Sequence, residues 1–471
     1  MTRYRQMALN AISRLGPRYM PFADVATDSV PLSRLLRLAL FQVTVGMALV
    51  LLVGTLNRVM IVELSVPASL VGVMISLPLV FAPFRALIGY RSDIHKSALG
   101  WRRVPYIWKG TMLQFGGFAI MPFALLVLSG YADAADAPRW IGYASAGLAF
   151  LLVGAGVHTV QTVGLALATD LVKPEDQPKV VGLMYVMLLI GMIVSAIIFG
   201  ALLVEYSPGR LIRVVQAAAV VTIVLNLLAL WKQEPRDRAR AAASAPAPEF
   251  RQAWALFVGT GAALPLLTVI GLGTMGFAMA DVLLEPYGGH VLNLSVAMTT
   301  RLTAVLAFGG LVGFTVASRV LSRGGDPIAM AWNGILIGLP GFAAIVASAP
   351  TQLPEIFVIG TLLVGYGAGL FGHGTLTATM RAAPKEQTGL ALGAWGAVQA
   401  TGAGVAVAMG GIIRDVIVAL PGSEHFRPET PYTPVFVLEI ILLAVALFAI
   451  FRMRHRGARR MDEQGYLPRQ G

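Results

Sequence analysis

Histidine, amide and indole side chains inside apolar stretches are the residues of this sequence best suited to binding chemistry. His158 lies near the middle of one such stretch, and His373 lies toward the C-terminal end of another. A neutral imidazole can ligate a metal ion, including the magnesium or iron of a tetrapyrrole, relay a proton, or simply hydrogen-bond to a neighbouring helix. Gln161 shares a helical face with His158, and Trp395 shares one with Gln399. These five side chains are our candidate binding residues for a large, mostly apolar ligand.

Four ionisable residues form a second group, near the ends of stretches that are long enough to cross a membrane. Arg58, Asp281, Glu285 and Arg301 are predicted to lie at similar depth on the periplasmic side. Because an unpaired charge inside a membrane is costly, we expect these four residues to form a charge cluster by pairing with one another. We identify no Asp or Glu near the middle of any span, which argues against transport driven through a proton relay.

Catalytic chemistry has few candidate residues in this chain. The sequence has no cysteine, which excludes disulfides, thiolate metal sites, iron–sulfur clusters and thiol nucleophiles. It also has no GxxxxGK[ST] loop, so ATP hydrolysis through that fold is excluded. We therefore predict no catalytic residues, no metal site and no catalytic cofactor, and we expect a protein that is not an enzyme.

The composition indicates a membrane protein. Of the 471 residues, 56% are hydrophobic and only 13% are charged, whereas soluble domains contain about 25% charged residues. A net charge of +12 would suggest nucleic-acid binding in a soluble protein. Most Lys and Arg, however, fall in the termini and in alternate connections between apolar stretches. The positive charge is therefore explained by membrane orientation and by anionic lipid, without nucleic acid.

Twelve stretches are long and apolar enough to cross a bilayer, which takes about 20 residues at 1.5 Å each. We place them near 38–62, 67–90, 106–130, 141–169, 180–204, 211–231, 260–284, 297–320, 328–348, 354–380, 388–413 and 433–451. The distribution of Lys and Arg places both termini in the cytoplasm.

The chain divides into two six-helix halves with cytoplasmic ends and a cytoplasmic connection. The expected segments are an N-terminal cytoplasmic segment 1–37, an N-terminal bundle 38–231, a charged Ala/Pro-rich linker 232–259, a C-terminal bundle 260–451 and a basic tail 452–471.

Weak internal similarity relates the two halves. Leu64-Ser65-Val66 before the second span recurs as Leu294-Ser295-Val296 before the eighth, and Gly117-Phe118-Ala119 in the third recurs as Gly341-Phe342-Ala343 in the ninth. Twelve helices in two related halves describe the major facilitator architecture, in which a cavity lies between the halves near the membrane midplane. The predicted fold is therefore an all-α polytopic membrane protein of that type.

A loop motif between the second and third spans supports this architecture. Gly89 and Asp93, followed by Arg102 and Arg103, resemble the facilitator loop motif of a glycine, an acid and paired basic residues. A carboxylate near one helix end and guanidinium groups on the next turn can clamp cytoplasmic helix ends and release them when the halves move. The alternative is ordinary positive charge in a cytoplasmic loop.

Longer strings resemble one branch of the major facilitators. They are the run from FQVTVGM to PYIWKG at 41–110, HTVQTVGLALATDL at 158–171, DVLLEPYGGHVLNLSV at 281–296, and an opening PFAD at 21–24. All of them are similar to the PucC/LhaA group, the bacteriochlorophyll-delivery branch. This resemblance covers most of the chain through about residue 400, and the strings are more specific than the general facilitator motifs.

The resemblance implies an assembly factor in the cytoplasmic or intracytoplasmic membrane of a purple phototroph. It implies bacteriochlorophyll as cargo, and light-harvesting α and β polypeptides as partners. The reaction centre–antenna complex and pigment-synthesis enzymes are further expected partners. His158 or His373 would then supply an axial ligand to the pigment magnesium. Two alternatives stay open: a secondary transporter of a hydrophobic small molecule, and a pigment-free scaffold for light-harvesting subunits.

Overall fold

The computed structural model describes residues 30–80, 88, 91–92, 101–130, 134, 136–173, 176–234, 259, 263–382 and 388–463. Eleven helices in this part are long and apolar enough to cross a membrane, and a shorter apolar helix covers Ala68–Leu79. Together they account for the twelve predicted spans. The described residues form an all-α fold, as the long apolar stretches predicted, because helices satisfy their own backbone hydrogen bonds inside a bilayer.

The N-terminal half begins with a first span built from several helical segments. Its elements are α2 (Leu32–Leu38), α3 (Leu40–Leu49), the π-helices η2 (Val50–Leu56) and η3 (Val59–Glu63), α4 (Ala68–Val80), α6 (Val104–Ser129), α7 (Arg139–Asp170), α8 (Gln177–Leu202) and α9 (Pro208–Leu230).

The C-terminal half repeats the pattern, with an interruption in its first span. Its elements are α12 (Ala263–Ala278), the 3-10 turn η6 (Met279–Val282), α13 (Leu284–His290), α14 (Val296–Ser322), α15 (Pro327–Thr351), α16 (Pro354–Ala382), α17 (Thr388–Val418), the 3-10 turn η7 (Ser423–His425) and α18 (Thr433–Glu463).

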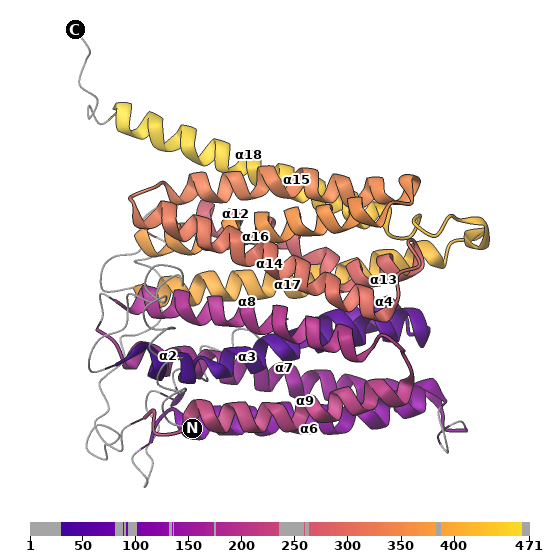
Figure 1. The fold of residues 1–471 in the computed structure, drawn as a ribbon. Coiled ribbons are helices and arrows are strands. Elements are labelled where there is room, and N and C mark those ends of the chain that lie inside the picture. Colours follow the sequence, from indigo (N-terminus) through magenta and orange to yellow (C-terminus); the bar gives the residue numbers. More distant parts are fainter. Residues whose placement is uncertain are drawn as a thin grey trace.

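The helices run side by side along one common direction, with the two halves stacked against each other (Figure 1). Helix α8 packs against α14, and α4 packs against α17, so these two pairs form the seam between the halves. Helix α2 and the C-terminal end of α18 lie at the same end of the bundle, shown on the left (Figure 1). This arrangement is the two-half, twelve-helix fold that the sequence predicted.

The predicted boundaries differ from the structure at the first and the last span. The first span begins at Leu32 rather than at residue 38, and α18 continues to Glu463, beyond the predicted end at residue 451. Arg34 lowers the apolarity of the first turns, yet it is held in the helix by hydrogen bonds to Gln233. Gln233 and its neighbour Glu234 in turn anchor the start of the predicted linker to the N-terminal half.

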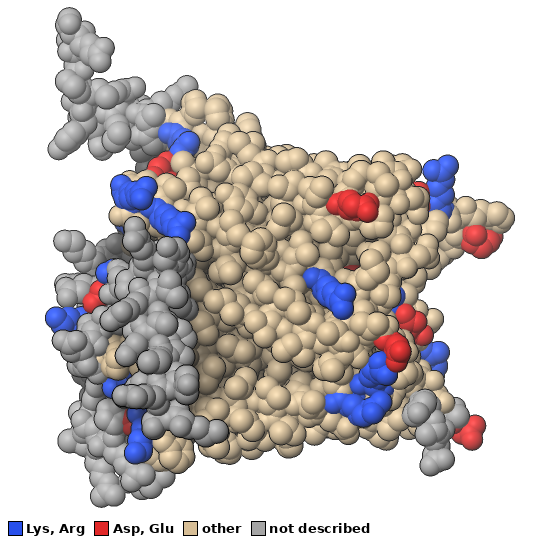
Figure 2. Space-filling model, in the orientation of Figure 1, with Lys and Arg blue, Asp and Glu red and all other residues tan. Residues whose placement is uncertain are grey.

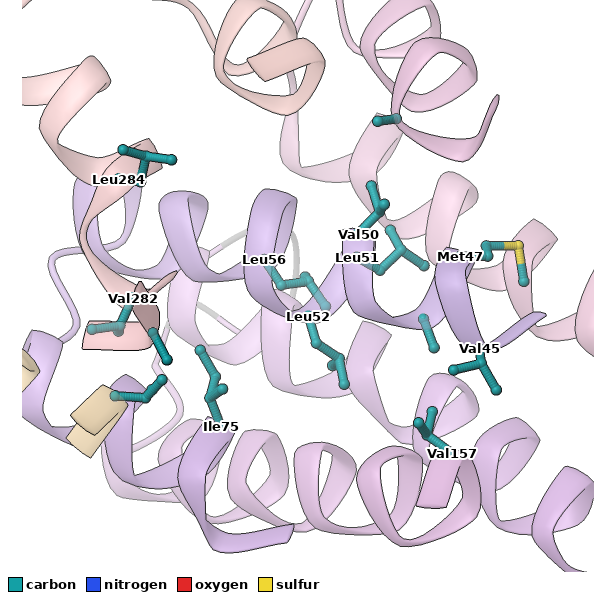
Figure 3. Packing of buried hydrophobic residues seen from close by; sticks show 14 of the residues in the cluster. Val45, Met47, Val50, Leu51, Leu52, Leu56, Ile75, Val157, Val282 and Leu284 are labelled. Atoms are coloured by element: carbon teal, nitrogen blue, oxygen red, sulfur yellow. The ribbon is translucent and has the colours of Figure 1, made fainter. Parts of the chain in front are cut away.

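Apolar side chains fill the interior and also cover the outside of the bundle. Leu52 and Leu56 of η2 lie in the buried core near Ile75 of α4 and Val282 of η6 (Figure 3). Large apolar side chains such as Ile197 and Phe448 are exposed. Acidic and basic residues gather mainly at the two ends, with a largely uncharged belt between them (Figure 2). Such a belt is what the hydrocarbon of a bilayer requires.

Candidate functional site

The seventh span is interrupted near the periplasmic side, where we expected charged residues. Helix α12 ends at Ala278, η6 makes one tight turn, and α13 resumes at Leu284. A break inside a membrane span leaves backbone groups that need other partners, and such discontinuous helices often mark binding sites in transporters.

Side chains from two other spans satisfy the backbone at this break. The Asn57 amide of the first span donates to the carbonyl oxygens of Asp281 and Val282, at 3.3 and 3.0 Å. Glu439 of α18 accepts a 2.6 Å hydrogen bond from the Ala280 N–H through Oε1. Because Asn57 belongs to the N-terminal half, the break is also a point where the two halves are joined.

Three acidic residues gather around the break. Glu285 is buried and accepts a 2.9 Å hydrogen bond from the Thr303 hydroxyl. Asp281 lies close enough to Glu285 and to Glu439 to interact electrostatically with both. Glu439 is fully buried. The arrangement gathers three acidic side chains inside the span region, at the end of the bundle that carries η6.

Glu439 is a buried acidic residue that the sequence analysis did not single out. It lies in the second turn of α18, at the end of the helix that contacts η6. The signal was present as a single acidic residue in the apolar run VFVLEIILL. The twelfth span therefore carries a buried group that can bind a proton, close to one end of the bundle.

The predicted pairing of the periplasmic charges is also wrong. Arg58 forms its ion pair with Glu63 and donates a 3.1 Å hydrogen bond to the Leu294 carbonyl oxygen. In the part of the chain that the structure describes, neither Asp281 nor Glu285 forms an ion pair. The π-helical winding of η3 is the physical reason, because its i→i+5 period brings residues five apart onto one face. An α-helix would separate Arg58 from Glu63.

Arg301 does not join this group. It lies on the exposed face of α14, and its side chain passes over Gly200 of α8. The Arg58–Glu63 pair instead has Tyr206 as a neighbour, in the connection between α8 and α9. Burial, followed by the negative charge of Glu63, raises the pKa of Tyr206 from 10.0 to about 12. Tyr206 therefore stays a neutral phenol beside the pair at physiological pH.

Further contacts join the halves at the same end. Asp415 of α17 accepts a 2.7 Å hydrogen bond from the Ser69 N–H, in the first turn of α4. Asp415 also pairs with Arg414 at 2.7 Å. A carboxylate at a helix N-terminus is favourable, because it satisfies a free N–H and faces the positive end of the helix dipole. Helix α4 is thus fixed by a residue of the opposite half.

His373 lies in a row of aromatic rings that crosses between the halves. Its ring centroid is 4.2 Å from that of Phe314 on α14, and Phe314 is 6.3 Å from Tyr185 on α8. A Cβ added at the preceding residue, Gly372, would meet nothing within 4 Å, so this neighbouring face of α16 is open. The structure therefore places this predicted residue at the seam, next to flat apolar surfaces.

The other candidate binding residues lie on two helices, one in each half of the bundle. Trp395 is buried and donates a 3.2 Å hydrogen bond to the Thr375 hydroxyl, which links α17 to α16, the helix of His373. Gln399 lies one turn further along α17 and is half-buried. His158 is half-buried and Gln161 is buried on α7, in the opposite half. The structure thus relates Trp395 to the helix of His373, whereas His158 and Gln161 form a separate pair.

The two arginines of the predicted cytoplasmic clamp contact Asp170 in the part of the chain that the structure describes. Gly89 and Asp93 lie outside the described residues. Arg103 pairs with Asp170 at the end of α7, at 3.1 Å, and Arg102 approaches the same carboxylate at 3.7 Å. Glu234 accepts hydrogen bonds from the N–H groups of both arginines, at 2.8 and 3.0 Å. These contacts tie the ends of α6, α7 and α9 together within the N-terminal half.

Comparison with known proteins identifies the family. A family model described as "PUCC protein" matches residues 55–458. The chain belongs to the PUCC family. It is 67% identical over 420 residues to Protein PucC of Rhodovulum sulfidophilum, covering 88% of this chain and 92% of that protein. It is also 27% identical over 450 residues to the bacteriochlorophyll synthase 44.5 kDa chain of Rhodobacter capsulatus, covering 91% of this chain and 97% of that one.

The PUCC chain shares its fold with solved transporters. One is a bacterial homologue of the human lysosomal transporter Spinster, in an inward-facing and unoccupied conformation. The TM-score is 0.62 at 17% identity, and the match covers 92% of this chain and 97% of the transporter. At this identity the likeness shows the fold alone, which is of the major facilitator type.

Proposed function

We propose that this PUCC-family membrane protein delivers bacteriochlorophyll to light-harvesting polypeptides and assists their assembly. Membership of the family, with relatives from purple phototrophic bacteria, supports a role connected with photosynthetic complexes. The observation that carries the finer proposal is the row of rings formed by His373, Phe314 and Tyr185, which reaches from α16 across α14 to α8 in the other half. An imidazole beside flat apolar rings is what binding of a magnesium tetrapyrrole needs.

Each part of this site has a role in the proposal. His373 supplies the axial nitrogen for the pigment magnesium, and Phe314 with Tyr185 provides apolar contact to the macrocycle. Trp395 and Gln399 on α17, and His158 with Gln161 on α7, supply the remaining polar contacts or a second pigment position. The pigment is treated as cargo, so it binds reversibly and carries out no chemistry on the protein.

The proposed partners are the light-harvesting α and β polypeptides. Pigment-synthesis enzymes are proposed partners that supply the pigment before delivery. The reaction centre–antenna complex is a proposed partner at the later stage of assembly. Pigment with a long apolar tail can pass laterally within the bilayer, because the outside of the bundle is itself apolar. We place the protein in the cytoplasmic or intracytoplasmic membrane, with both termini in the cytoplasm, on the basis of the Lys and Arg distribution.

The test is purification of the tagged protein from membranes that produce pigment. An absorption spectrum and a solvent extraction are taken beside a major facilitator of unrelated function, handled identically. Delivery predicts stoichiometric bacteriochlorophyll that survives washing and is missing from the control. A colourless protein that still carries light-harvesting polypeptides would instead support the pigment-free scaffold.

A second candidate function is secondary transport of a hydrophobic small molecule. The specific observation in its favour is the interrupted seventh span with buried acidic residues, a feature of ion-coupled carriers. Purified protein in vesicles with an imposed proton gradient distinguishes the two functions. Gradient-dependent solute flux supports transport, whereas pigment binding without flux supports delivery.

A further inference from the structure

Glu439 combines complete burial with an incomplete set of hydrogen bonds. Its Oε1 accepts from the Ala280 N–H at 2.6 Å, while Oε2 is buried and has no hydrogen-bond partner. A carboxylate with a bare oxygen in a low-dielectric interior is strongly unfavourable, unless a cation or a proton compensates it. The free oxygen therefore points to a missing ligand of positive charge.

Among the described residues, the elements that pack against α18 supply no basic side chain to Glu439. Helix α18 packs against α12, α15, η6 and α17. Helices α12 and α15 contain no charged residue. The turn η6 contributes Asp281, which is followed by Glu285 on α13, and both are acidic. On α17 the nearest charges are Arg414 and Asp415, which pair with each other.

The geometry around Glu439 favours a proton over a metal ion as the bound species. A metal ion needs several ligands converging on one point, and no group of three His, Asp or Glu side chains in the described chain converges in that way. A proton needs only one oxygen. We propose that Glu439 is a reversible proton-binding site, and that its proton keeps the interrupted seventh span closed against the first span.

The coupling follows from the residues that share the break. Glu439 accepts a hydrogen bond from the Ala280 N–H. Asn57 of the opposite half donates to the next two carbonyl oxygens, those of Asp281 and Val282. Loss of the proton places a negative charge on Glu439 in a buried position beside the acidic side chain of Asp281, and burial without water makes this charge strongly unfavourable. Water then enters around η6 to solvate the charged carboxylate. The hydrogen bonds from Asn57 to the backbone of η6 are lost, and the two halves separate at this end of the bundle. Protonation therefore stabilises the conformation described here, independently of any pigment.

The direct test is infrared spectroscopy on the full-length protein in lipid nanodiscs at neutral pH. A protonated carboxyl has a C=O stretch that an ionised carboxylate lacks. We expect such a band in the wild-type protein and a loss of intensity equal to one carboxyl in E439Q. The matched control is E424Q, because Glu424 is 69% exposed in the connection after α17. A wild-type protein with no protonated carboxyl band would overturn the proposal, whether or not E439Q folds.

The coupling is tested by distance measurement between spin labels. The chain has no cysteine, so W140C and L353C give one label on each half at the same end, at positions 67% and 48% exposed. As the pH rises from mildly acidic to mildly alkaline, the wild-type distance should lengthen. E439Q should keep the short distance throughout, and E424Q should follow the wild type. An E439Q protein that responds to pH like the wild type, or a wild type without response, refutes the coupling.

Discussion

His373 illustrates what a single residue gains from its tertiary neighbours. In the sequence it is one histidine in an apolar helix, for which a helix–helix hydrogen bond is as reasonable as ligation. In the structure its ring lies 4.2 Å from the ring of Phe314, at the seam between the halves. The ring of Phe314 in turn lies 6.3 Å from that of Tyr185 on α8 of the other half, whereas His158 lies on α7, away from this row of rings. Of the two histidines, His373 is the better candidate ligand.

We therefore predict that His373→Ala lowers pigment binding more than His158→Ala does. Removing an axial ligand should weaken binding by about tenfold, or about 1.4 kcal/mol. The measurement is the bacteriochlorophyll content of each purified variant after identical washing. His425→Ala is the matched control, because His425 is 84% exposed in a connecting loop. Equal pigment content in all three variants would exclude ligation by either histidine.

At the scale of elements, close packing of helices positions His373. Helix α16, which carries His373, packs tightly against both α14 and α15. At Gly365 the approach to α14 is so close that an added Cβ would lie 2.1 Å from the Leu306 carbonyl oxygen. Only a glycine fits there, and such small residues allow backbones to approach within membranes. The same helix also carries Gly372, where a Cβ would meet nothing within 4 Å.

These two glycines form a matched pair on one helix. Gly365→Ala should destabilise the protein by about 1–3 kcal/mol, because α14 and α16 must move apart to admit the methyl group. Gly372→Ala should be neutral or stabilising by up to about 1 kcal/mol, since alanine favours the helix and meets open space. Thermal unfolding in one detergent measures both. If Gly365→Ala unfolds at the wild-type temperature, the described α14–α16 packing is incorrect.

Over the residues that the structure describes, polar contacts of different kinds lie at the two ends of the bundle. At the end that carries η6, the Asn57 and Asp415 side chains each bond to the opposite half. At the other end, Arg103 pairs with Asp170 inside the N-terminal half, and Arg454 pairs with Asp326 inside the C-terminal half. The end with η6 is therefore held closed by cross-half contacts, as the proton proposal requires.

The orientation of the whole molecule is itself a prediction. Glu424 lies in the connection between α17 and α18, and Arg323 lies in the connection between α14 and α15. In the otherwise cysteine-free chain, E424C should react with a membrane-impermeant thiol reagent added to intact spheroplasts, while R323C should react only after lysis. Reaction of R323C in intact spheroplasts would reverse the assigned orientation.

Local sequence alone determined the number of spans, the two halves and the family. Span number follows from hydrophobicity over about 20 consecutive residues, and both the halves and the family follow from strings that are contiguous in the chain. The candidate residues could be selected in the same way, since a histidine or an arginine in an apolar run is visible without a structure. Glu439 was equally visible, but its apolar run gave no indication of a partner.

Tertiary structure decided which of these residues act together. Glu439 meets Ala280 across 159 residues, and Asn57 meets Val282 across 225. No local pattern encodes such contacts, because they depend on how the spans pack and on where the seventh span breaks. The pairing of Arg58 with Glu63 is close in sequence, yet it depends on π-helical winding that apolar periodicity does not predict. Hydrophobicity fixes which segments enter the membrane, while the polar contacts among those segments form only once the bundle has assembled.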